Sequence, residues 1–61
     1  MKLYRVAGED LLSGERHEGL YLASNKKNAM ALSDHDAVIS GWTDDEMWWV
    51  IKEVEELPLR G

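Results

Sequence analysis

Histidine and cysteine, the side chains most used for catalysis and transition-metal binding, are scarce in this chain. It has two histidines and no cysteine. His35 lies between two acids in the stretch "DHD", residues 34–36. Imidazole and carboxylate groups are metal ligands, but neighbouring side chains diverge and these three form an incomplete set at an unusual spacing. We therefore predict a polar turn at this stretch and no metal site.

A nucleophile and a base could be sought in Ser13 with His17, or in Ser33 with His35. Such a pair needs a third group to orient the histidine and a pocket that excludes water, and a chain of 61 residues rarely encloses one. The glycines of "SGERHEG" lack the lysine and the strand-to-helix context of a phosphate-binding loop. We expect a protein that is not an enzyme and that binds no cofactor.

The stretch "WTDDEMWWV", residues 42–50, holds all three tryptophans around three consecutive acids. Aromatic side chains bury about 150–250 Å² each, and a chain without phenylalanine needs that area for its core. Adjacent tryptophans on a strand point to opposite faces. One of Trp48 and Trp49 then belongs to the core. The other, ringed by carboxylates, has the composition of an interaction hot spot with a polar rim.

We assign Trp48 to the core and Trp49 to the contact surface, because strand alternation continues the face of Trp49 into Glu53 and Glu55. Acids at these positions are also typical of an ordinary solvated surface. The predicted protein-binding residues are Trp49, Met47, Ile51, Asp44, Asp45, Glu46, Glu53 and Glu55.

Two segments near the start of the chain, residues 2–7 and 17–23, alternate in the manner of strands, and Gly8, Ser13 and Gly14 between them favour a hairpin. A two-residue turn would place the leucines of the second segment on the face that bears Arg5. A loop of odd length or a bulge would instead gather one apolar face. We prefer this second register, whose shared face comprises Tyr4, Val6, Leu20 and Leu22.

A helix should follow, with Ser24 as its N-cap and alanine, methionine and leucine in residues 29–32. We expect it to end near residues 33–36, where polar side chains compete for the backbone. Residues 37–40, "AVIS", are then a brief strand or a buried connection.

The segment from Thr43 onward has two interpretations. Thr43 and Glu46 have the spacing of a capping box, which favours a helix. Residues 48–51, "WWVI", are aromatic or β-branched, which favours a strand. We choose the strand because a third strand gives the sheet enough apolar face to be stable.

The predicted architecture is therefore a single small α+β domain over residues 1–61, with a loose tail from about residue 58. Its element order is β-β-α-β, an antiparallel sheet with one helix packed on one face. The alternative, with a C-terminal helix from Thr43, is β-β-α-α. One helix covers one face of a sheet, so the opposite face should stay open.

Composition restricts the classes of partner. Twelve acids against seven bases give a formal net charge of −5, which opposes phosphate backbones, so direct nucleic-acid binding is not expected. No apolar run approaches the length of a membrane span, and no signal-peptide core follows Met1. We expect a cytoplasmic protein without a membrane partner.

The leading hypothesis is a non-enzymatic protein-binding module that occupies the surface of a partner protein, as an inhibitor or accessory factor of a phage or other mobile element. One alternative is an acidic mimic of nucleic acid that blocks a DNA- or RNA-binding protein. Another is a homodimer of structural role, in which the open face closes on a second copy.

Overall fold

The computed structural model describes residues 1–59. Its elements are β1 (Lys2–Asp10), β2 (Arg16–Ala23), α1 (Lys26–Ile39), the short 3₁₀ helix η1 (Glu46–Trp48) and β3 (Trp49–Leu57). The predicted α+β domain with the order β-β-α-β is confirmed, and the alternative with a C-terminal helix is wrong. The predicted tail starts directly after β3, and its last two residues lie outside the described residues.

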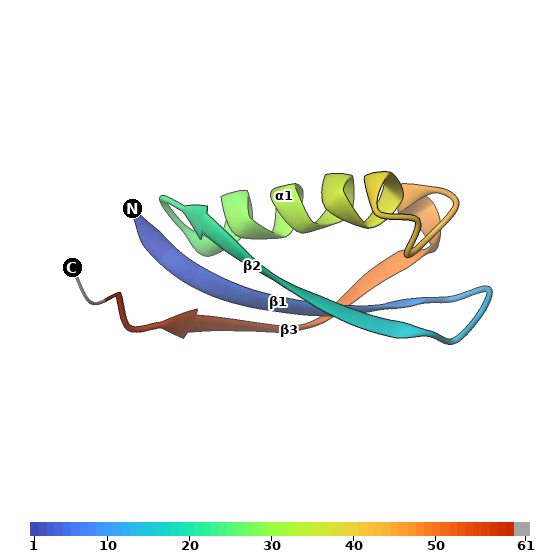
Figure 1. The fold of residues 1–61 in the computed structure, drawn as a ribbon, viewed down its shortest axis with the longest axis horizontal. Helices are drawn as coiled ribbons and strands as arrows, with labels where there is room; N and C mark the ends of the chain where they lie inside the picture. The colour runs from blue at the N-terminus through green and yellow to red at the C-terminus, as the bar shows by residue number, and fades with distance from the viewer. Residues whose placement is uncertain (60–61) are drawn as a thin grey trace.

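β1 is the central strand of an antiparallel sheet with the order β2-β1-β3. Figure 1 shows the sheet strongly twisted, with α1 lying over one of its faces. No other element of residues 1–59 covers the opposite face, which we name the open face. The sheet therefore has one face that packs a core and one that meets solvent, as the sequence predicts.

The pairing of β1 with β2 places Leu20 and Leu22 on the open face. Leu20 lies opposite Arg5, and Leu22 lies opposite Leu3. Leu20 and Leu22 are accordingly 62% and 53% exposed. The predicted register, which groups these leucines with Tyr4 and Val6, is wrong.

The physical reason lies in the hairpin turn of residues 11–14. The Asp10 N–H donates to the Glu15 carbonyl oxygen at 2.9 Å, and the Asp10 carboxylate accepts from the Leu12 N–H at 2.8 Å. Gly14, with φ of 76°, completes the turn in a conformation that favours glycine. The turn holds an even number of residues, so the faces alternate without the shift that the preferred register needs.

α1 begins and ends later than predicted. Its N-cap is Asn25, whose side-chain oxygen accepts from the Asn28 N–H at 2.9 Å, while Ser24 accepts from the Asn28 side chain. The helix continues through Ser33 and Asp36 because these polar side chains have partners in the sheet and do not compete for the helix backbone. The brief strand or connection predicted for residues 37–40 is wrong, because this segment is the last turn of α1 and its C-cap.

The helix meets the sheet with small residues, Ala29, Ser33 and Ala37, each 0% exposed. Aromatic rings supply the remaining area. Trp49 lies against Gly8 so closely that a Cβ there would stand 2.6 Å from the Trp49 Cε2 atom. Tyr21 covers Gly19 of its own strand in the same way. The buried apolar residues of the core are Tyr4, Val6, Ala23, Ala29, Ala37 and Trp49.

The predicted assignment of the two adjacent tryptophans is wrong, because the two residues have exchanged places. Trp49 is 5% exposed and belongs to the core, whereas Trp48 is 36% exposed. The reason is a bulge: Ala7 pairs with Glu53 and Gly8 pairs with Ile51, so Lys52 is an extra residue in β3. The bulge shifts the alternation, and Glu53 and Glu55 therefore lie on the open face, away from Trp49.

Candidate protein-interaction surface

The connection between α1 and β3 is held in place by hydrogen bonds. The Trp42 and Thr43 N–H groups donate to the Ala37 carbonyl oxygen at 2.8 and 3.2 Å. The buried Thr43 hydroxyl donates to the Asp45 carbonyl oxygen at 3.1 Å. The Asp45 carboxylate in turn accepts from the Met47 N–H at 3.0 Å and starts η1. η1 therefore has a fixed position relative to the helix.

Large apolar side chains are exposed around η1. Met47 is 70% exposed and Ile39 is 68% exposed. The Leu11 N–H donates to the Trp48 carbonyl oxygen at 2.8 Å, so the hairpin turn and η1 lie side by side. We name this surface the exposed end, and it consists of Leu11, Leu12, Val38, Ile39, Asp44, Asp45, Glu46, Met47 and Trp48.

Acidic groups border these apolar side chains. A groove of about 250 Å³ is lined by Val38, Ile39, His35 and the carboxylates of residues 44–46. Beside it, partial burial raises the pKa of Asp34, and the nearby charge of Glu46 raises it further. Within residues 1–59 no lysine or arginine forms an ion pair with these acids. The exposed end thus combines apolar side chains with an unneutralised negative border.

The predicted binding residues are found in three different places. Met47 and the acids at residues 44–46 lie together at the exposed end. Trp49 is in the core and Ile51 packs against that core, so neither forms part of this surface. Glu53 and Glu55 lie on the open face. That Met47 and residues 44–46 bind a protein stays a prediction.

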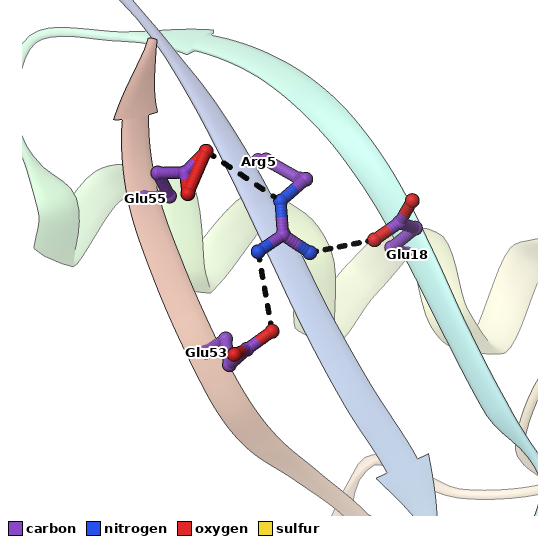
Figure 2. Close-up of polar contacts among 4 residues, drawn as sticks. All are labelled: Arg5, Glu18, Glu53 and Glu55. Carbon is purple, nitrogen blue, oxygen red and sulfur yellow. Dashed lines mark hydrogen bonds and ion pairs between the residues drawn. The ribbon is translucent and has the colours of Figure 1, made fainter.

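On the open face, the guanidinium of Arg5 joins all three strands. Its nitrogen atoms lie 2.6 Å from a Glu18 oxygen, 3.1 Å from a Glu53 oxygen and 3.8 Å from a Glu55 oxygen. Figure 2 shows Glu18 reaching it from β2 and the other two from β3. Hydrogen bonds to Glu18 and then to Glu53 raise the pKa of Arg5. These acids are therefore partly neutralised, unlike those of the exposed end.

The stretch at residues 34–36 is helical, so the predicted polar turn is wrong. Successive side chains on a helix point about 100° apart. Asp36 accepts from the Tyr21 hydroxyl at 2.6 Å and from the Ser40 hydroxyl at 3.2 Å, and His35 is exposed. In the described part of the chain, no group of three His, Cys, Asp or Glu side chains could hold a metal ion.

The serine and histidine pairs considered for catalysis do not form. Ser13 accepts from the Glu15 N–H at 3.2 Å, and Ser33 accepts from the Trp49 Nε1–H at 3.4 Å. His17 instead stacks on Trp42, with ring centroids 5.1 Å apart and planes 3° from parallel. These contacts give Ser13, Ser33 and His17 structural partners within the fold.

Sequence reasoning missed five members of the exposed end: Leu11, Leu12, Val38, Ile39 and Trp48, which it assigned to the core. Leu11 and Leu12 are 52% and 61% exposed, and Ile39 is 68% exposed. The stretch "LLSG" carried a usable signal, because two adjacent leucines next to turn residues cannot both point to one face of a strand. The exposure of Ile39 could not be predicted from the sequence, because this exposure depends on how far α1 extends.

No protein-family model, curated protein or solved structure matches this chain. Across residues 1–59, α1 is the longest helix, and no helix is both long and apolar enough to cross a membrane.

Proposed function

We propose that this protein is a non-enzymatic binding module that uses the exposed end to occupy a surface of another protein. One observation carries the proposal: Met47, Trp48 and Ile39 are exposed on a segment that hydrogen bonds hold in place. Apolar anchors that are already positioned lose little conformational entropy on binding. The negative border predicts a partner with an apolar pocket and a basic rim.

The biological role that we propose is that of a cytoplasmic inhibitor or accessory factor of a phage or other mobile element, on the basis of small size and acidity. Mimicry of nucleic acid has less support. Three acids of the open face pair with Arg5, and Glu56 lies 3.6 Å from the Lys2 ammonium, so the negative charge is interrupted. Binding by a mimic should weaken steeply with salt, whereas an apolar interface should show a mild dependence.

The test is co-purification of tagged protein from its native host, with wild type compared with the double variant Met47→Ser/Trp48→Ala. A hot spot is worth about 2 kcal/mol or more, so we expect the captured amount of a specific partner to fall at least roughly tenfold. The variant Leu59→Ser is the matched control, because Leu59 is 52% exposed and lies outside the exposed end. Equal capture by all three folded proteins would refute the proposal.

A further inference from the structure

β2 is an edge strand, and half of it lacks the features that usually prevent edge pairing. In the sheet of residues 1–59 its only neighbour is β1. Natural edges are protected by charges, bulges or proline. β3, the other edge, has the bulge at Lys52 and several acids. Residues 19–23 of β2, "GLYLA", contain no charge and no proline, and their pairing with β1 is regular.

The backbone of this half is oriented for a further strand. The bond from the Asp10 N–H to the Glu15 carbonyl oxygen marks a hydrogen-bonded pair. Such pairs alternate along an antiparallel ladder. Leu20 and Leu22 therefore direct their N–H and C=O groups away from β1, toward the unoccupied edge.

The space beside this edge is apolar. A groove of about 470 Å³ between β2 and α1 is lined by Leu22, Leu32, Ala31 and Met1, among others. Leu32 is 44% exposed and Leu22 is 53% exposed. A strand added to β2, with the helix that accompanies it, would remove this surface from water.

The charges at the two ends of β2 have opposite signs. At its start the exposed Glu15 and Glu18 flank Arg16, which pairs with Glu9, and Glu18 also bonds to Arg5. Lys26 and Lys27 are exposed just beyond its end. Within the described residues neither lysine has an ion-pair partner. An antiparallel copy of the same strand would bring acids against lysines at both ends. A parallel copy would bring like charges together.

We propose that two copies of this chain associate through their β2 edges, antiparallel about a two-fold axis, to form one continuous six-stranded sheet. This surface differs from the open face, through which the sequence suggested self-association. The inference does not depend on the proposed function, because η1 at the exposed end lies outside the β2 edge.

The test is the mass of the full chain in solution by sedimentation equilibrium, over micromolar to millimolar concentration. Wild type should give twice 7.0 kDa. One variant, Lys26→Glu/Lys27→Glu, makes both ends of the edge acidic. The other, Glu15→Lys/Glu18→Gln, makes the acidic end basic and leaves an acceptor for Arg5. Each variant alone should give 7.0 kDa, and an equimolar mixture should recover the doubled mass.

Lys52→Glu, on the other edge strand, is the control and should keep the doubled mass. Far-ultraviolet circular dichroism of each variant separates loss of pairing from loss of fold. A wild-type mass of 7.0 kDa throughout would overturn the proposal. A doubled mass in both folded charge variants would also overturn it, because the contact would then lie on another face. A mixture of the two folded variants that fails to associate would overturn it as well.

Discussion

Replacing Trp49 with alanine should unfold the domain. Its side chain is 5% exposed, covers Gly8, lies 5.7 Å from Trp42 between ring centroids and donates a 3.4 Å hydrogen bond to Ser33. Truncation of a buried tryptophan costs about 3–5 kcal/mol, and the long hydrogen bond adds less than about 1 kcal/mol. A core of this size rarely supplies more than about 3–5 kcal/mol. The loss therefore equals or exceeds the whole free energy of unfolding.

Trp48→Ala is the matched control, because it makes the same change one residue earlier at a side chain that is 36% exposed. We expect it to cost about 1–2 kcal/mol and to leave a folded protein. Urea denaturation followed by far-ultraviolet circular dichroism, at one fixed protein concentration, compares the two. Trp49→Ala should show no cooperative transition. Equal midpoints, or a less stable Trp48→Ala, would show that the core does not depend on Trp49.

Three further changes test other parts of the structure. Gly8→Ala should lower the free energy of unfolding by about 1–3 kcal/mol, because its Cβ would meet the Trp49 ring and lie 2.9 Å from the backbone oxygen of Val50; a urea midpoint equal to wild type would contradict this. Burial and then the Asp36 carboxylate raise the pKa of Tyr21 from 10.0 to about 12, so its contribution to stability is complete below pH 10.0 and is lost as the pH rises toward 12. Phenolate absorbance should show Asp36→Asn moving the pKa back toward 10.0, and an unchanged titration would contradict the assignment. EDTA should leave the melting temperature unchanged, and a fall of several degrees would reveal a bound metal.

The strands could be predicted because their signal is local. The alternation of residues in segments 2–7 and 17–23 predicts β1 and β2 without any knowledge of how the strands pair. The capping box predicted at residues 43–46 does not form: Asp45 caps the single turn of η1, and the Thr43 hydroxyl donates to the Asp45 carbonyl oxygen. Val50 and Ile51 then pair with β1, and this tertiary pairing ends the helical segment.

The division of residues between faces could not be predicted, because it depends on single residues at distant positions. The hairpin register follows from the turn that starts at Asp10, and the tryptophan assignment follows from the bulge at Lys52. The turn lacks the one-residue shift that the preferred register needs, whereas the bulge introduces such a shift within β3. The exposed end was found in part, since Met47 and the acids at residues 44–46 lie within it, but its leucines come from the other end of the sequence.

The central position of β1 also determines how this chain can fold. β1 meets β2 after a short turn, since Arg5 and Glu18 are 13 positions apart, but the contact of Arg5 with Glu53 spans 48 positions. Closing the longer loop costs about 1 kcal/mol more in chain entropy. The hairpin should therefore form first and remain unstable by itself. During synthesis, the core stays incomplete until Trp49 has been added, so this small domain should fold only after most of its chain has been made.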